Sequence, residues 1–471
     1  MAAKKETSKP GRKSEKIKNA VPPPDLPQTP AESEAATEAA PPVGPGEEAV
    51  ESIETRKFPI VGIGASAGGL EALEKFFRSV PPGSDMAFVV IVHLDRHHVS
   101  LLPQLLQNYT SMKVSTVEDG MAILPNQVYV APSNKDMIIM KGVLHLLEIA
   151  DSAGLRLPID DFFRSLAQDQ GEDACCIILS GTGSDGSSGL KVIKSEGGLV
   201  LVQDEESAKY NGMPRSAIAT GMVDFVLPPD EMLERLIKYR QTTIRLGRVK
   251  TTVPEPKVLD DLPKIFALMR ARTGHDFSLY KTGAILRRLK RRMGLNQIEQ
   301  VSHYVGFLRQ NPGEIDKLFM DILIGVTSFF RDKEAFQVLK DKVLPQVLAN
   351  LSPPQTFRAW VVGCSTGEEA YSIAITIREC LNTMNKEINF QVFATDIDNF
   401  AIAKARAGSF PLSISTEVSP EILDRYFIKE NTSYLIRKEI RESMVFAVQD
   451  VLKDAPFSRL DLLSCRNLLI Y

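Results

Sequence analysis

The stretch FPIVGIGASAGGLEALEKFF, residues 58–77, decides the fold of the first half of this chain. Its apolar run Ile60–Ile63 is typical of a buried parallel strand, and the apolar residues that follow at helical spacing predict a helix. Between the two, Gly64 and Gly68 flank Ser66 and permit backbone angles that larger residues resist. A strand, a tight turn and a helix in this order can present one serine hydroxyl outward as a nucleophile.

The composition sets bounds on the class of protein. The chain has 471 residues, of which 44% are hydrophobic and 24% charged, and its net charge is −3, which allows two or three ordinary cores. The sequence contains neither an apolar run long enough for a membrane span nor a secretory signal, so we expect a cytoplasmic protein. The adjacent Cys175 and Cys176 lie in an apolar run, where strand geometry points them to opposite faces as buried thiols.

Composition and periodicity divide the chain into consecutive parts. Residues 1–55 are rich in Lys, Glu, Pro and Ala and are predicted to be a disordered tail. Residues 57–240 alternate short apolar runs with helical patterns, which predicts an open, doubly wound α/β domain with a parallel sheet. After a linker over 241–257, residues 258–345 predict a small all-α unit. Residues 346–471 show a second α/β pattern that stops directly after a strand, so we expect an incomplete Rossmann-like domain.

Polar residues follow three apolar runs of the first α/β pattern. A serine needs a base to take its proton and a carboxylate to orient that base. His93 ends the run AFVVIVH, and Asp185 lies in LSGTGSDGSSG directly after CCIILS. Because the carboxyl ends of parallel strands share one edge of the sheet, we expect Ser66, His93 and Asp185 to converge. The glycine-rich loop around Asp185 also offers backbone N–H groups for an oxyanion.

Each of these features has an ordinary structural explanation when it is taken alone. A serine between glycines often arises by chance, and a histidine at the end of a strand is usually structural. His97 and His98 compete with His93 for the role of base, although their loop favours solvent exposure. The three residues together favour a hydrolase.

The segments GASAGG, IVHLD and LSGTGSDG, together with YVAP and YNGMP, resemble the catalytic domain of the chemotaxis protein-glutamate methylesterase CheB. The resemblance covers roughly residues 57–240. It implies that Ser66 is the nucleophile, His93 the general base and Asp185 its orienting acid. The implied reaction is hydrolysis of the methyl ester of receptor glutamates, in some members with deamidation of glutamine.

A second strand, loop and helix occur in AWVVGCSTGEEAYSIAITI. The small residues of the loop allow a ligand to approach the backbone, and Glu368 and Glu369 in the first helical turn disfavour a phosphate, so a neutral or cationic ligand fits better. Asp396 ends the next apolar run, where a carboxylate can bind a ribose diol. The alternative for Asp396 and Asp398 is a helix N-cap.

With GVTSFFRD before this loop and SCRNLLIY after it, residues 258–471 resemble the chemoreceptor glutamate methyltransferase CheR, which uses S-adenosylmethionine. The resemblance implies that Arg331 lies near the carboxylate of this cofactor, Asp396 at its ribose, and Tyr471 near the reacting methyl group. No metal site is expected. The full set of residues implied to line the cofactor site is Thr327, Arg331, Glu368, Asp396, Asp450, Val451, Arg466 and Asn467.

The segment AILRRLKRRMG concentrates basic residues within two helical turns: Arg287, Arg288, Lys290, Arg291 and Arg292. The ordinary interpretation is a solvated helix face. The resemblance implies instead that this region meets the acidic methylation helices of chemoreceptors, with charge steering the encounter. Nucleic acid binding is disfavoured, because no stacking aromatics are interleaved and the chain is slightly acidic.

These observations together predict a bifunctional enzyme that removes and adds methyl groups on receptor glutamates. One alternative is a signalling scaffold with an active esterase and an inactive, truncated methyltransferase half. Another is a hydrolase of small esters, which would need a deep apolar acyl pocket.

Overall fold

The computed structural model describes residues 58–93, 101–149, 156–247, 256–323 and 325–470. The predicted tail, the two competing histidines His97 and His98, and Tyr471 lie outside these ranges.

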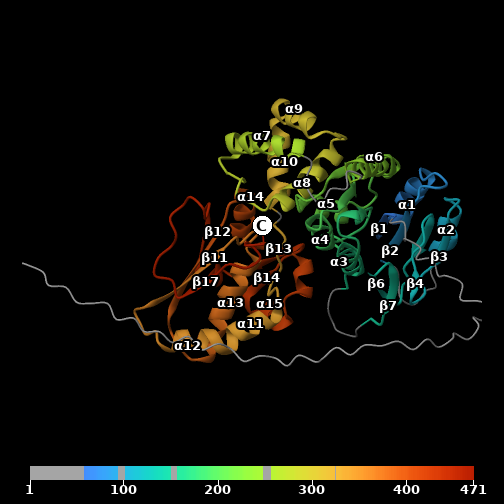
Figure 1. Cartoon of the computed structure of the whole chain (residues 1–471). Helices are drawn as coiled ribbons and strands as arrows, with labels where there is room; N and C mark the ends of the chain where they lie inside the picture. Colours follow the sequence, from blue (N-terminus) through green and yellow to red (C-terminus); the bar gives the residue numbers. More distant parts are fainter. Residues whose placement is uncertain (1–57, 94–100, 150–155, 248–255, 324, 471) are drawn as a thin grey trace, which may run out of the picture. The chain divides into compact units, whose positions relative to one another are not determined.

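The first region is built on a seven-stranded sheet in the order β10-β9-β8-β1-β2-β5-β3, and every neighbouring pair is parallel (Figure 1). This confirms the predicted open parallel α/β fold. The strands are β1 (Ile60–Ala65), β2 (Ala87–Val92), β3 (Lys113–Thr116), β5 (Gln127–Val130), β8 (Cys175–Ile178), β9 (Leu199–Gln203) and β10 (Phe225–Leu227).

Helices cover both faces of this sheet because alternate strand residues are apolar on each side. One hydrophobic core contains residues of α1 (Gly69–Arg78), α2 (Leu102–Gln107) and α6 (Pro229–Gly247). The other contains residues of α3 (Pro158–Gln170), α4 (Gly189–Ser195) and α5 (Gly212–Ala219). The sheet is therefore wound on both sides.

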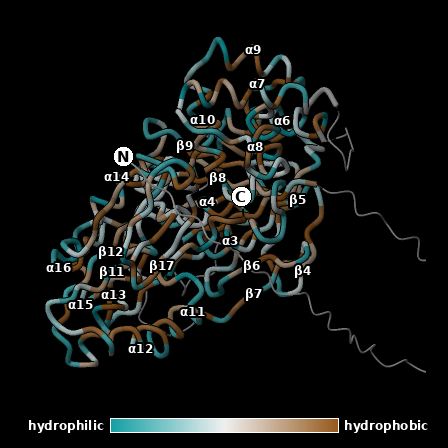
Figure 2. Tube along the Cα trace, turned by 60° about the vertical axis from the view of Figure 1, so that its left-hand side comes forward, coloured by the Kyte–Doolittle hydropathy of each residue, from teal (hydrophilic) through white to brown (hydrophobic). Residues whose placement is uncertain are grey.

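The adjacent cysteines of β8 show the alternation directly. Cys175 belongs to the core with α1 and Cys176 to the core with α3, and both are buried free thiols, as predicted. The hydrophobic residues of β8 and β9 can be followed as brown segments in Figure 2. A small antiparallel sheet in the order β4-β7-β6 packs beside α3, with strands β4 (Met121–Ala122), β6 (Asp136–Met140) and β7 (Val143–Leu147).

The second region is helical. It consists of α7 (Pro256–Thr273), α8 (Thr282–Leu295), α9 (Val301–Gln310) and α10 (Pro312–Leu323), which share a core around Met269, Leu289, Tyr304 and Leu318.

Two predicted boundaries are corrected by the packing. Helix α6 continues to Gly247, so the first residues of the predicted linker 241–257 are helical, and Thr242 among them is buried. The all-α unit ends with α10 and not at residue 345. Phe336 of α11 (Lys333–Val338) and Leu344 of α12 (Leu344–Ala349) are buried in the hydrophobic core of the next sheet. These two helices therefore belong to the third region.

The third region has a parallel sheet in the order β16-β12-β11-β17, as the second α/β pattern predicted. Its strands are β11 (Thr356–Val362), β12 (Asn389–Asp396), β16 (Met444–Val448) and β17 (Leu462–Ser464). The larger core on one face holds α13 (Glu368–Thr383) and α14 (Asn399–Ala407), and a smaller cluster around Trp360 lies on the other.

Short elements complete this region. An antiparallel sheet in the order β13-β15-β14 contains β13 (Ser409–Pro411), β14 (Phe427–Lys429) and β15 (Ser433–Ile436). Helices α15 (Pro420–Tyr426) and α16 (Lys438–Arg441) lie in the same stretch. Within the described ranges, no helix is long and apolar enough to cross a membrane.

The basic helix α8 is only partly a solvated face, which corrects the ordinary interpretation of its sequence. Arg291 is 4% exposed and pairs with Asp224, which directly precedes β10, and with Asp321 of α10 at 2.7 Å. Lys194 of α4 lies 2.6 Å from Asp224 and 3.0 Å from Asp321. These four residues form what we call the buried ion network, and it joins the first region to the helical region.

Opposite charges explain why this network tolerates burial. Burial by itself raises the pKa of Asp321, but Arg291 and Lys194 outweigh it, so that the pKa lies well below its usual range. Arg292, the next basic residue, binds Glu314 at 2.6 Å inside the helical region. Arg287 and Lys290 remain on the exposed side of the helix.

Candidate functional sites

Ser66 lies in the turn between β1 and α1, as the sequence predicts. Its backbone N–H donates to the carbonyl of Ser180 at 3.0 Å, which ties the turn to the strand beside it. Gly68 has φ of 71°, a left-handed conformation that places the helix start directly behind the serine. The Ser66 side chain is therefore held on the rim of the sheet, partly exposed.

His93 and Asp185 follow the strands on either side of β1, because the sheet runs β8-β1-β2. His93 Nε2 lies 2.7 Å from Asp185 Oδ2, and the histidine side chain is 33% exposed whereas that of Asp185 is 2% exposed. The three predicted residues thus come from three adjacent strands at one edge. Since Nε2 faces the carboxylate, Nδ1 is the nitrogen left to accept a proton.

Three backbone amides hold the Asp185 carboxylate. Oδ2 accepts the N–H of Ile159 at 3.0 Å, and Oδ1 accepts those of Asp160 at 2.9 Å and Gly186 at 2.8 Å. A buried carboxylate with this many donors stays in one orientation and presents one oxygen to the histidine. The carboxylate is thus held in place beside the imidazole of His93.

The glycine-rich loop offers fewer amides for an oxyanion than its sequence suggests. The N–H of Gly181 donates to the carbonyl of Tyr210 at 2.9 Å, and the N–H of Gly186 is bound to Asp185. Ser187 donates to the carbonyl of Ser184 at 3.1 Å. These three N–H groups are engaged within the protein, so an oxyanion has to use others.

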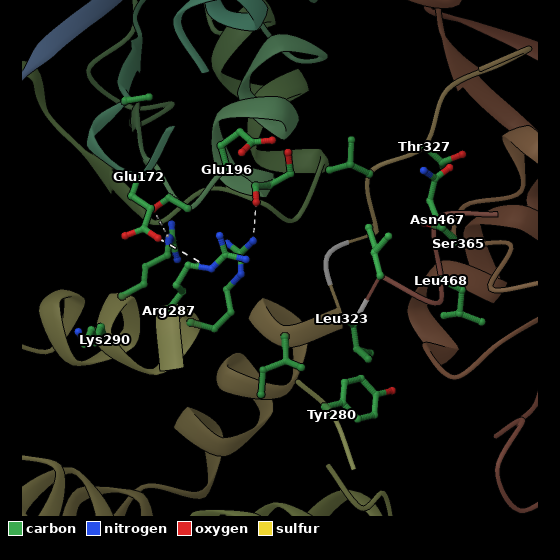
Figure 3. Close-up of a pocket in the computed structure, with 18 of the residues that line it drawn as sticks. Glu172, Glu196, Tyr280, Arg287, Lys290, Leu323, Thr327, Ser365, Asn467 and Leu468 are labelled. Atoms are coloured by element: carbon green, nitrogen blue, oxygen red, sulfur yellow. Dashed lines mark hydrogen bonds and ion pairs between the residues drawn. The ribbon is translucent and has the colours of Figure 1, made fainter. Parts of the chain in front are cut away.

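A cavity of about 1070 Å³ lies at the carboxyl ends of β11 and β12 and extends to α8 and to the loop before β8. Figure 3 shows Thr327, Ser365 and Asn467 gathered on one side of it, and Glu172, Glu196 and Arg287 on the other. Seven of the eight residues predicted for the second site line this cavity: Thr327, Arg331, Asp396, Asp450, Val451, Arg466 and Asn467.

Glu368 is the predicted residue that does not line the cavity. It is 5% exposed and accepts a hydrogen bond from the Thr366 hydroxyl at 2.6 Å, and burial raises its pKa. Its neighbour Glu369 lines the cavity instead, where it accepts a hydrogen bond from the Ser464 hydroxyl at 2.6 Å. Gly367, with φ of 96°, is the N-cap of the helix that carries both glutamates.

Asp396 is anchored by the backbone at the end of β12. One carboxylate oxygen accepts the N–H of Ser365 at 2.8 Å and the other that of Asp398 at 2.9 Å. Burial raises the pKa of Asp396. The N-cap alternative holds for Asp398, which accepts the N–H of Phe400 at 2.8 Å, but not for Asp396. Asp396 is therefore a fixed acceptor facing the cavity.

Two arginines, Arg331 and Arg466, also line the cavity. Arg331 donates to the carbonyl of Val326 at 3.1 Å, and Arg466 donates to the carbonyl of Arg331 at 2.7 Å and to Asp332 at 2.6 Å. In the described part of the chain, Arg331 forms no ion pair with its neighbours Asp332 and Glu334. Its guanidinium has donors left for a ligand carboxylate.

His275 is a contributor that the sequence did not indicate. Its Nδ1 lies 3.0 Å from Asp450 Oδ2, and its ring stacks on Phe319 of α10. Burial opposes ionisation of Asp450, but hydrogen bonds from His275 and Leu452 lower its pKa overall. His275 thus ties the helical region to Asp450 in the wall of the cavity. Sequence patterns could not indicate this contact, because the two residues are far apart along the chain.

The first site has the groups of a serine esterase, and the second lies where α/β domains bind nucleotide-like ligands. Family models match both. Residues 61–236 match CheB methylesterase, residues 260–323 the all-alpha domain of CheR methyltransferase, and residues 325–471 the SAM binding domain of CheR methyltransferase. Along the chain, a match to CheB methylesterase is thus followed by matches to the two domains of CheR methyltransferase.

Related proteins agree with this assignment. An uncharacterized 104.1 kDa protein of Rhodobacter capsulatus is 36% identical over 391 residues, which are 79% of this chain and 41% of that protein. Protein-glutamate methylesterase/protein-glutamine glutaminase 1 of Geobacter metallireducens is 34% identical over 41% of this chain and 56% of its own length. The chain thus spans about half the length of the curated relatives it matches.

Among solved structures, the catalytic domain of the Thermotoga maritima CheB methylesterase is similar. It is 29% identical, with a TM-score of 0.36, and the match covers 38% of this chain and 98% of that one.

Proposed function

We propose that the first region hydrolyses methyl esters of glutamate side chains and that the following regions transfer methyl groups from S-adenosylmethionine to glutamate carboxylates. The observation that carries the first activity is the short contact between His93 and Asp185, whose carboxylate is held by three amides. The match to both families supports the pair of activities.

In the esterase reaction, Ser66 Oγ attacks the ester carbonyl while His93 Nδ1 takes its proton. The bond to the methoxy group then breaks, and His93 returns the proton to the leaving methanol. Water, activated in the same way, cleaves the acyl-serine and restores the enzyme. Asp185 holds the imidazole in the orientation that leaves Nδ1 available.

The residues around the cavity fit S-adenosylmethionine, which supplies the methyl group when it is bound. Asp396 offers two anchored oxygens to a ribose diol, and Arg331 offers a planar pair of donors to a carboxylate. Glu369 adds negative charge to the cavity and thereby suits a cationic ligand. The protein then contributes mainly position and exclusion of water, because the acceptor glutamate is itself the nucleophile.

The substrates we propose are methyl-accepting chemoreceptors or related signalling proteins, acted on in the cytoplasm. The names of the methylesterase relatives, which include glutaminase activity, extend the proposal to deamidation of receptor glutamine. The scaffold alternative, with an inactive transferase half, differs from ours in one measurable respect. It predicts methanol release without any transfer of label from S-adenosylmethionine.

The test uses the chain with receptor membranes carrying labelled methyl esters. We expect release of labelled methanol, and its loss in Ser66→Ala with the fold unchanged by circular dichroism. Release that persists in Ser66→Ala would contradict the assignment of the nucleophile. In a parallel assay with unlabelled membranes, labelled S-adenosylmethionine should give base-labile label on the receptor, and its absence would favour the scaffold.

A further inference from the structure

Asp160 is a fully buried aspartate in the first turn of α3, directly behind the esterase site. Its backbone N–H donates to Oδ1 of Asp185 at 2.9 Å. Its own Oδ1 accepts the N–H groups of Ser188 at 2.9 Å and Gly189 at 2.6 Å. Asp160 therefore binds the loop that carries the orienting acid at two points, at Asp185 through its backbone and at Ser188 and Gly189 through its side chain.

The packing around Gly189 shows how closely α3 and this loop approach each other. A Cβ atom built on Gly189 would lie 2.6 Å from Cβ of Phe163 and 2.8 Å from the carbonyl oxygen of Asp160. Space of this kind admits only glycine, so the amide of Gly189 can reach the Asp160 carboxylate. The close packing of α3 against Gly189 thus brings the amide of Gly189 within hydrogen-bonding distance of Asp160.

We propose, on the basis of the esterase function above, that Asp160 is a positioning residue of that site. Its carboxylate fixes the start of α4, and through it the loop 185–189, so that Asp185 keeps the distance to His93 at which the imidazole is oriented. Asp160 is 0% exposed and acts through Asp185, and it does not touch the substrate.

The second carboxylate oxygen of Asp160 is in a different situation from that of an ordinary, solvent-exposed helix cap. Oδ2 of Asp160 is buried and has no hydrogen-bond partner in the described part of the chain. Burial, together with the neighbouring Asp185, raises the pKa of Asp160 to about 7. Burying a carboxyl oxygen without a partner costs free energy that an apolar side chain would avoid. An apolar or shorter side chain, however, would not supply the oxygen that accepts hydrogen bonds from Ser188 and Gly189.

The experiment measures kcat and KM for methanol release in the full chain, with three variants beside Ser66→Ala. Asp160→Ala removes the acceptor and leaves the amides of Ser188 and Gly189 unpaired. Asp160→Asn keeps an acceptor oxygen of the same reach. Asp161→Asn is the matched control, because Asp161 is the next residue, is half exposed and pairs only with Arg164 across its own helix.

We expect Asp160→Ala to lower kcat by about 100-fold with KM little changed, since small displacements of catalytic groups have effects of this size. Asp160→Asn should restore kcat to within about tenfold of the wild type, because the two hydrogen bonds return. Asp161→Asn should be indistinguishable from the wild type. Wild-type kcat in folded Asp160→Ala would overturn the proposal.

A double-variant cycle distinguishes positioning from loss of stability. In the Asp185→Asn background, adding Asp160→Ala should lower kcat by less than about threefold, because residues that act as a unit are not additive. A full 100-fold further loss would overturn the proposal. If Asp160→Ala does not fold, Asp160→Ser takes its place in both measurements. Failure of the proposed function itself is recognised separately, by a wild-type chain whose methanol release does not depend on Ser66.

Discussion

The two candidate sites differ in how much of their geometry the protein fixes by itself. In the esterase site, Asp185 is held by three amides, two of them from α3, and contacts His93 at 2.7 Å. In the cavity of the transferase regions, the lining residues come from loops, α8, the end of β12 and the stretch around Arg466. The esterase site acts with its own side chains, which the protein holds in place. The cavity acts through a bound ligand, which its lining residues surround.

This contrast predicts that the two sites respond differently to substitution. Removal of one group from the esterase site disables a unit of three. Removal of one group from the cavity takes away one contact among several.

The largest effect is expected for Asp185→Asn, which keeps the shape of the side chain but no longer orients the imidazole as a carboxylate does. Methanol release should fall by about 10⁴-fold. Methyl transfer from S-adenosylmethionine in the same preparation should be unchanged, and it serves as the internal control. A parallel loss of both activities would mean that the two sites are not separate.

The next effect concerns the buried ion network. Arg291→Met removes the guanidinium that pairs with both Asp224 and Asp321, and breaking a buried ion pair costs about 3–5 kcal/mol. The control is Arg245→Met, because Arg245 forms an exposed ion pair with Glu299 across the same two regions, worth about 0–1 kcal/mol. We expect a lowered urea midpoint for Arg291→Met alone. Equal, small changes in both variants would show that the network does not hold the regions together.

A smaller effect is expected in the cavity. Asp396→Ala should weaken binding of S-adenosylhomocysteine by about 1.5–3 kcal/mol, the range for hydrogen bonds to a charged group. Isothermal titration calorimetry measures it, with Asp398→Ala as the control, since Asp398 caps α14 and its loss affects stability instead. Unchanged affinity in Asp396→Ala would exclude the ribose role.

A last effect is a dependence of stability on pH. The folded pKa of Asp160 is raised above its unfolded value, so the native state binds more protons between about pH 4 and 7 and loses stability as the pH rises through this window. Asp160→Asn removes the loss. Its stability relative to the wild type should therefore increase with pH, by at most about 1.4 kcal/mol per pH unit. Thermal melts at pH 5 and pH 8 measure the difference, and a constant gap would contradict it.

The contact between His93 and Asp185 could be predicted from the sequence because both residues follow strands. Ser66, His93 and Asp185 each end an apolar run, and parallel sheets bring such ends to one edge. Asp160 could not be found in this way, since it lies inside a helix and acts through its backbone amide and a buried carboxylate. In the sequence it looks like any acidic residue in a first turn.

The transferase regions were predicted less completely for a related reason. Glu368 and Glu369 are adjacent in sequence and both lie in the first turn of α13, but only Glu369 lines the cavity. His275 reaches Asp450 across a long separation in sequence, and Arg291 finds its partners in two other segments. Local patterns identify strand ends, but they do not disclose contacts between distant elements.

The buried ion network also bears on how this protein can be divided for study. A fragment that stops at Gly247 keeps Asp224 and Lys194 but loses Arg291, so a carboxylate that is 0% exposed in its side chain would face a new surface with one counter-ion fewer. A fragment that begins at α7 keeps Arg291 and Asp321 and loses the other two. The two halves are therefore modular in sequence but share charges in the folded state, and an excised half is best made with Arg291 or Asp224 replaced by a neutral residue.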